Sequence, residues 1–221
     1  MVRFMRIPSG LCLIGFILFS SLPIAQSDES KNLLPDGFRC FLVVDRRFEP
    51  KDERNRSGKF HCPVCEFGLS PTLAIFSRSV PTNADDPLIK LIVLQDELSK
   101  KYKPLRMGAF DIFLTLKQKF EDDEDRDAKV GAISAFCQQT NSPHVITGLA
   151  EATIPDSEGN AKANPSLKSF GVEDNDEIVF LFYYRLKPVK IWKFTKDKMP
   201  KAEDREEITK VVNDKLEKLL R

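Results

Sequence analysis

The segment HCPVCEFGLSPTLAIFSR, residues 61–78, carries the most information about this fold. Two cysteines, Cys62 and Cys65, stand three positions apart, and Pro71 separates them from the apolar run TLAIFS at 72–77. A short apolar run with a proline before it and a charged residue after it is typical of a buried strand. The sequence therefore predicts a pair of thiols at the start of the first core strand.

Helical and strand patterns alternate on both sides of this segment. At 86–102, apolar residues recur at helical spacing, behind a capping Asp86 and with Pro87 in the first turn. The other expected elements are strands at 38–44, 107–116 and 143–148, helices at 125–140 and 206–220, a short helix around 165–170, and a hairpin of strands at 177–184 and 189–194. Helical crossovers require parallel neighbours and the hairpin adds antiparallel ones. The expected fold class is α/β, with a mixed central sheet flanked by helices and an N-terminal strand and loop extension.

Residues 1–27 have the order of a secretory signal peptide. Arg3 and Arg6 precede an apolar stretch at 11–24, and small residues follow at 25–27. The stretch is shorter than the roughly 20 residues of a bilayer span, so we expect it to be cleaved and the chain to be exported, to the periplasm or outside the cell. The expected organisation is a signal peptide at 1–27, an N-terminal extension at 28–59 and one domain at 60–221.

Charge and motifs exclude several classes of function. Without Arg3 and Arg6, the chain carries 32 basic and 33 acidic residues of mixed order. Nucleic-acid and anionic-lipid binders need a basic patch, so we expect neither nucleic acid nor, after signal cleavage, a membrane as partner. The sequence has no GxSxG, P-loop, GxGxxG or HExxH motif. The sequon at 55–57 matters only in a host that glycosylates.

The order of elements resembles the thioredoxin fold, a βαβα half followed by ββα, with one additional strand. Ser142 and Pro143 precede a strand, where thioredoxin-like proteins carry a cis-proline, and the phrase SFGV at 169–172 precedes another. The phrase CxxCxxGxxP, running into a strand that ends at Arg78, resembles a group of exported bacterial thioredoxin-like proteins. The resemblance covers residues 60–220. It implies a superfamily, and it makes Cys62, Cys65 and Pro143 the candidate catalytic residues.

The position of the cysteines departs from that pattern. In redox-active thioredoxins the CxxC follows the first core strand and opens a helix. Here the residues after that strand, RSVPT at 78–82, contain no cysteine, and the pair comes before the strand. Thioredoxin chemistry therefore cannot simply be transferred.

Three uses of the cysteine pair remain open. A CxxC disulfide forms and breaks readily, and we favour thiol–disulfide exchange with protein thiols or disulfides, with Cys62 as the more exposed attacking sulfur. Thiolate stabilisation is weak, because Gly68 and Pro71 prevent a long helix and His61 is only partly protonated at neutral pH. The alternatives are a structural disulfide in a non-catalytic binding module, and a zinc or copper site. That metal site would draw on Cys62, Cys65, His61 and His144.

Two further cysteines remain after Cys12 leaves with the signal peptide. Four cysteines allow three disulfide connectivities. Cys40 is a candidate partner or resolving thiol for the pair, or a strand cysteine in a local bridge. Cys137 falls on the apolar face of its helix, which indicates a buried core residue.

Overall fold

The computed structural model describes residues 37–115, 123–155 and 157–220. The predicted signal peptide at 1–27 lies outside these ranges. Within them, no helix combines the length and the apolar character that crossing a membrane would require.

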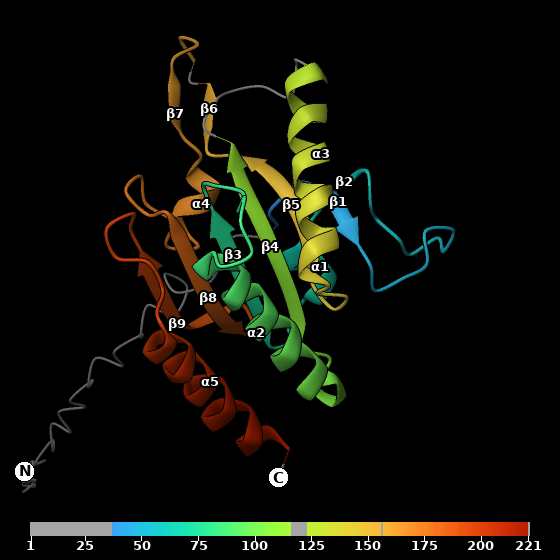
Figure 1. The fold of residues 1–221 in the computed structure, drawn as a ribbon, viewed down its shortest axis with the longest axis vertical. Coiled ribbons are helices and arrows are strands. Elements are labelled where there is room, and N and C mark those ends of the chain that lie inside the picture. Colours follow the sequence, from blue (N-terminus) through green and yellow to red (C-terminus); the bar gives the residue numbers. More distant parts are fainter. Residues whose placement is uncertain (1–36, 116–122, 156, 221) are drawn as a thin grey trace, which may run out of the picture.

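A seven-stranded mixed sheet forms the centre of the domain, in the order β2-β1-β5-β4-β3-β8-β9 (Figure 1). Its strands are β1 (Cys40–Asp45), β2 (Lys59–His61), β3 (Thr72–Ser77), β4 (Gly108–Thr115), β5 (Ile146–Glu151), β8 (Ile178–Tyr184) and β9 (Lys187–Phe194). The three central strands β3, β4 and β5 are parallel, and the outer strands join them by antiparallel pairing. A small hairpin, β6 (Thr153–Pro155) with β7 (Ala161–Ala163), forms a second sheet.

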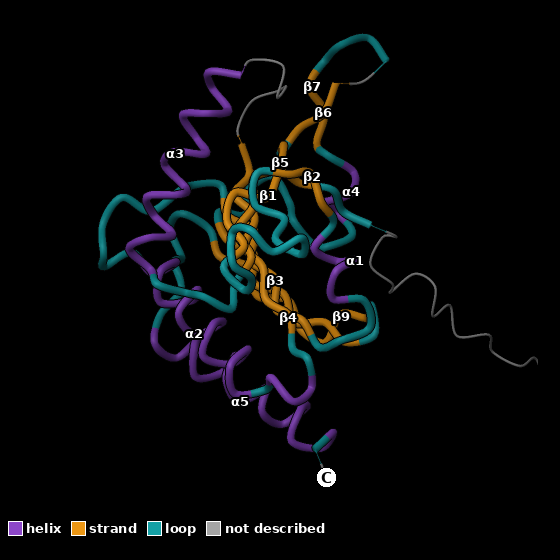
Figure 2. Tube along the Cα trace, turned by 90° about the vertical axis from the view of Figure 1, so that its right-hand side faces the viewer, coloured by secondary structure: helices purple, strands orange, loops and turns teal. Residues whose placement is uncertain are grey.

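Helices cover the two faces of this sheet unequally (Figure 2). Three long helices, α2 (Pro87–Lys101), α3 (Asp123–Thr140) and α5 (Ala202–Leu216), lie on one face, and the short helices α1 (Pro63–Phe67) and α4 (Pro165–Lys168) lie on the other. Single 3-10 turns, η2 (Lys103–Leu105) and η3 (Glu217–Leu219), follow α2 and α5. Each layer has its own apolar cluster, so the sheet separates two hydrophobic cores.

The local sequence explains why these elements form. Every residue of β3 is buried, as expected of a strand covered by helices on both faces. The carboxylate of Asp86 accepts a hydrogen bond of 2.8 Å from the backbone N–H of Leu88, and Pro87 occupies the first turn of α2. The strand predicted at 72–77 and the capped helix that follows it are therefore confirmed.

The mixed sheet, the hairpin β8–β9 and the final helix are also confirmed, with boundaries shifted by a few residues. The expected strand at 143–148 begins later, at Ile146. Three elements were missed in the prediction: the three-residue edge strand β2, the single-turn helix α1 and the hairpin β6–β7. The strand at Cys40–Asp45 pairs with β5, so the N-terminal extension contributes to the central sheet.

The expected likeness of Pro143 to a cis-proline is wrong. The peptide bond before Pro143 is trans, as are all others in the described residues. The physical reason is its place in the chain: Pro143 lies in a helix-to-strand connection leading into β5, which runs parallel to β4. That connection is closed by a turn, in which the N–H of Val145 donates to the carbonyl of Ser142.

The loop between β1 and β2 is organised around one buried amide. The side-chain nitrogen of Asn55 donates to the carbonyls of Asp45, Phe48 and Glu49 at 3.1, 2.9 and 3.3 Å, and its oxygen accepts from the N–H of Ser57. Asn55 is only 7% exposed. The loop therefore has a defined conformation despite its charged, polar sequence.

A carboxylate, Asp111, lies at the centre of the sheet beneath the three long helices. Asp111 is 1% exposed, and its two oxygens have no hydrogen-bond partner among the described residues; the same holds for Oε1 of Gln95. Burial, and to a smaller degree the charge of Asp96, raises the pKa of Asp111 well above its ordinary value. The folded protein therefore keeps this group protonated under conditions where the unfolded chain ionises it.

Asp111 should make the stability of the protein fall as pH rises. The unfolded carboxyl ionises near pH 3.9, whereas the folded one stays protonated, so above that pH the folded state binds one more proton. Stability should fall by about 1.4 kcal/mol per pH unit up to the folded pKa. In urea unfolding from pH 4 to 9, Asp111→Asn should remove this slope and be the more stable protein at alkaline pH. Parallel pH profiles for parent and variant would contradict this.

Candidate functional site

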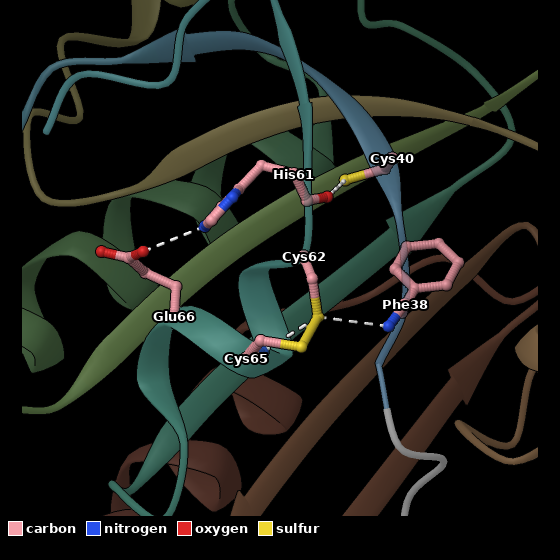
Figure 3. Close-up of a disulfide and its surroundings, with 6 residues drawn as sticks. All are labelled: Phe38, Cys40, His61, Cys62, Cys65 and Glu66. Atoms are coloured by element: carbon pink, nitrogen blue, oxygen red, sulfur yellow. Dashed lines mark hydrogen bonds and ion pairs between the residues drawn. A yellow bond between two sulfur atoms is a disulfide. The ribbon is translucent and has the colours of Figure 1, made fainter. Parts of the chain in front are cut away.

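The sulfurs of Cys62 and Cys65 are joined in a disulfide at the beginning of α1, with their Cα atoms 5.2 Å apart (Figure 3). Cys62 is the N-cap of α1, Pro63 is in its first turn, and Gly68, with φ of 53°, ends it after five residues. Proline and glycine at these positions favour a single turn over a longer helix. The pair thus stands ahead of β3, as the sequence predicted.

The sulfur of Cys62 accepts two backbone hydrogen bonds. It accepts backbone N–H groups from Cys65 at 3.0 Å and from Phe38 at 3.3 Å (Figure 3). Both donors would also stabilise a negative charge on this sulfur, because a hydrogen bond to the charged form favours ionisation. One donor thus comes from the short helix and the other from the chain ahead of β1.

Exposure of the two cysteines is the reverse of the prediction. Cys62 is 8% exposed, whereas Cys65 is exposed at the surface. Phe38, just ahead of β1, lies over Cys62 with its N–H on the sulfur, and its ring packs edge-on against Phe76. The neighbouring Gly37 lies against both sulfurs: a Cβ there would be 3.4 Å from that of Cys65 and 3.7 Å from that of Cys62. Local sequence could not reveal this cover, because it comes from 24 residues upstream.

A ring-on-backbone contact holds α1 against the sheet. The side chain of Phe67 lies directly on Gly108, the first residue of β4, and leaves no room there for a Cβ atom. The same ring stacks on Phe110, with centroids 6.3 Å apart and planes 6° from parallel. Gly108 is therefore a glycine because of close packing, and Phe67 fixes the distance between α1 and β4.

A chain of charged groups ties α1 to the loop after β1. Arg47 forms two hydrogen bonds of 2.9 Å with the carboxylate of Asp45 and reaches Glu66 at 3.3 Å. Glu66 also contacts Nε2 of His61 at 3.0 Å (Figure 3). Burial alone would lower the pKa of Arg47, but the hydrogen bond and charge of Asp45, with the charge of Glu66, raise it. Arg47 therefore stays charged and holds α1 in place.

The two histidines singled out in the sequence each contact a carboxylate, and Pro143 and His144 line a pocket together with Glu66 and Phe67 of α1. The backbone N–H and the Nδ1 atom of His144 contact Asp96 of α2, at 2.7 and 3.2 Å. No group of three or more His, Cys, Asp or Glu side chains suited to a metal ion occurs in the described parts of the chain. The two histidines are thus drawn to separate carboxylates rather than to the two cysteines.

Cys40 and Cys137 are free thiols in buried positions. Burial raises the pKa of Cys40 to about 12 and that of Cys137 to about 11, so neither is a thiolate at neutral pH. The prediction that Cys137 is a core residue is confirmed. Cys40 lies in the same apolar cluster as Cys62, and its S–H points to the carbonyl of His61 at 3.8 Å.

The opposite end of β3, where the sequence has no cysteine, is closed by a loop. Arg78 donates from Nε to the carbonyl of Asp176 at 2.7 Å and from Nη2 to the carbonyl of Glu173 at 2.9 Å. Arg78 therefore fixes the carboxyl end of β3 to the loop that leads into β8.

Sequence reasoning missed Asp45, Arg47 and Gly108 as parts of the site. Glu66 stands five residues after His61, and this spacing around a tight turn was the one signal available. The other partners come from elements that only the folded sheet brings together.

Comparison with known proteins finds similarity to several solved structures. Neither a family model nor a curated protein matches the chain. It is similar to the solved structure of a putative protein disulfide isomerase from Bacteroides thetaiotaomicron, with 12% identity, a TM-score of 0.47 and coverage of 83% of this chain and 89% of that one. It is also similar to peroxidoxin BcpB from Mycobacterium tuberculosis, with 10% identity, a TM-score of 0.48 and coverage of 82% of this chain and 94% of that one. A SCO1/SenC family lipoprotein from Bacillus anthracis has 10% identity and a TM-score of 0.40, with coverage of 83% of this chain and 95% of that one.

The protein has a thioredoxin-like α/β fold. This statement rests on its own connectivity: β3, α2 and β4 form a parallel crossover unit, β8 and β9 complete the sheet beside β3, and α5 closes the chain. The added strand β5 and the N-terminal strands β1 and β2 extend the sheet beyond β4.

Gly108→Ala should displace the ring of Phe67 and lower the free energy of unfolding by about 1–3 kcal/mol, the usual cost of overpacking. Gly131→Ala is the matched control, because Gly131 lies on α3 with nothing within 4 Å of an added Cβ. The control should be neutral or slightly stabilising, since alanine suits a helix better than glycine. Urea unfolding of the oxidised proteins measures both. Equal stability of the Gly108→Ala variant and the parent would contradict the conclusion that the contact of Phe67 with Gly108 holds α1 on the sheet.

Proposed function

We propose that this chain is an exported thiol–disulfide exchange protein that acts through Cys62 and Cys65. The observation that carries the proposal is the asymmetry of the pair: an exposed Cys65 is bonded to a buried Cys62 whose sulfur accepts two backbone N–H groups. Exchange rates depend on which sulfur is accessible and on how stable the departing thiolate is. Here Cys65 is the more exposed residue, whereas the hydrogen bonds that would stabilise a thiolate go to the sulfur of Cys62.

The first step is attack by a thiolate of a partner protein on the sulfur of Cys65. A bond forms between the partner sulfur and Cys65, the bond between Cys65 and Cys62 breaks, and its electron pair leaves on Cys62. The N–H groups of Phe38 and Cys65 stabilise the Cys62 thiolate by donating hydrogen bonds to it.

The second step releases the partner. A second thiolate of the partner attacks the partner sulfur held on Cys65, so the partner gains a disulfide and Cys65 departs as a thiolate. Each thiolate of the pair then takes up a proton according to its pKa. The partner has lost two electrons and the pair has gained them. In the reverse direction Cys65 attacks a partner disulfide, and Cys62 resolves the mixed disulfide.

Export is supported by the order of charged, apolar and small residues at 1–27. In an oxidising compartment the pair would rest as a disulfide. A structural disulfide is the competing reading, and the packing of Gly37 and Phe38 over Cys62 favours it. The two readings differ in whether the pair exchanges with external thiols.

Single-cysteine variants separate the roles of the two sulfurs. The Cys62→Ser variant leaves an exposed, unresolved Cys65, which should form a stable mixed disulfide with glutathione disulfide. The Cys65→Ser variant leaves the buried Cys62, which should react at least tenfold more slowly, because access limits the attack. Serine keeps an N-cap acceptor at position 62. Mass spectrometry of timed, acid-quenched samples measures the rates.

The parent protein provides the thermodynamic control. Equilibration in glutathione buffers of varied ratio should give one reversible two-electron transition, lost in both variants. A parent that shows no transition, together with variants that react equally slowly, would identify the bond as structural. Faster reaction at Cys62 than at Cys65 would overturn the assignment of roles while leaving redox activity intact.

A further inference from the structure

A pocket of about 440 Å³ lies beside α1, at the end of the sheet where β3 and β4 begin. Its walls come from four separate regions: the loop after β1, helix α1 and the turn after it, the end of α2 with η2, and the connection into β5. This volume falls in the range of about 300–1,000 Å³ that small-molecule sites occupy. Nothing in the proposed exchange chemistry uses this pocket.

The charge of the lining is strongly one-sided. Four cationic side chains, Arg46, Arg47, Lys103 and Arg106, face one carboxylate, Glu66. Glu66 is already engaged by Arg47 and His61, and the nearby carboxylate of Asp96 is engaged by His144. Within the described ranges, Arg46, Lys103 and Arg106 have no carboxylate partner. Three cations therefore converge on the pocket without neutralisation.

A buried polar group lies in the wall of the pocket. Ser99 of α2 lines the pocket and is 4% exposed, and its hydroxyl has no hydrogen-bond partner among the described residues. A buried hydroxyl without a partner carries a free-energy cost. A ligand that accepted its proton would remove that cost on binding.

The wall nearest the disulfide is rigid. The guanidinium of Arg47 lies over the rings of Phe48 and Phe67, at 5.1 and 5.2 Å from their centroids, and is held by Asp45 and Glu66. Because these contacts fix the wall before any ligand arrives, binding loses little side-chain entropy there. Since Arg47 is already paired, the attraction for an anion comes from Arg46, Lys103 and Arg106.

We infer that this pocket is a binding site for a small anion with two or more negative charges, held by Arg46, Lys103 and Arg106 and by the hydroxyl of Ser99. Phosphate and carboxylate groups both fit, because guanidinium and ammonium groups recognise either oxyanion. The inference is independent of the exchange activity, since it involves neither cysteine.

Calorimetric titration with pyrophosphate and with citrate, each in sodium chloride at matched ionic strength, tests this site on the oxidised protein. At least one probe should bind at one site per chain, and the preferred probe distinguishes phosphate from carboxylate. The variant Arg46→Gln should weaken binding about tenfold, and neutralising Arg46, Lys103 and Arg106 together to glutamine should weaken it at least a hundredfold.

Two controls separate a built site from general attraction. Replacing the exposed Lys196, Lys198 and Lys218 by glutamine makes the same change in net charge away from the pocket, and it should leave the affinity within about twofold. Ser99→Ala should weaken binding about tenfold without lowering the stability of the free protein, because it removes an unpaired buried hydroxyl. Absence of binding by both probes would overturn the inference. So would equal losses in the pocket and control triple variants, or full affinity in both Ser99→Ala and Arg46→Gln.

Discussion

The contact between the ring of Phe67 and the bare backbone of Gly108 determines where the dithiol lies. It holds α1 on the sheet, and the contacts of Glu66 with Arg47 and with His61 tie the turn that carries the cysteines to its surroundings. Without this packing contact, a helix of five residues would have too few internal hydrogen bonds to be stable. The orientation of the disulfide is therefore a property of tertiary packing rather than of the CxxC segment.

The two ends of the buried strand β3 have different surroundings. The cationic pocket lies where β3 begins, whereas Arg78 closes the other end against the carbonyls of Glu173 and Asp176. The fold is thioredoxin-like, yet its CxxC pair precedes the first core strand in the chain. Similarity of fold alone thus says little about the position of a site in this protein.

The sequence was informative where short-range patterns dominate. The continuous apolar run at 72–77 and the Asp86–Pro87 start of α2 each encode their structure within a few residues, and both were predicted correctly. Pro143 was misjudged because the fold inserts β5 as an additional parallel strand, which no local pattern reveals. The predicted order of exposure of Cys62 and Cys65 was wrong for a related reason: Phe38 covers Cys62 from a distant part of the chain.

The amide of Asn55 has a practical consequence for producing the protein. Its nitrogen already binds three carbonyls inside the loop between β1 and β2, so a sugar attached there could not coexist with the folded loop. An oligosaccharide transferred to Asn55 of the nascent chain would take one of the two amide hydrogens and add a bulky group inside the loop, leaving backbone acceptors unpaired. Secretion from a host that glycosylates this sequon would therefore disturb the loop, whereas a host without this modification would make the native loop.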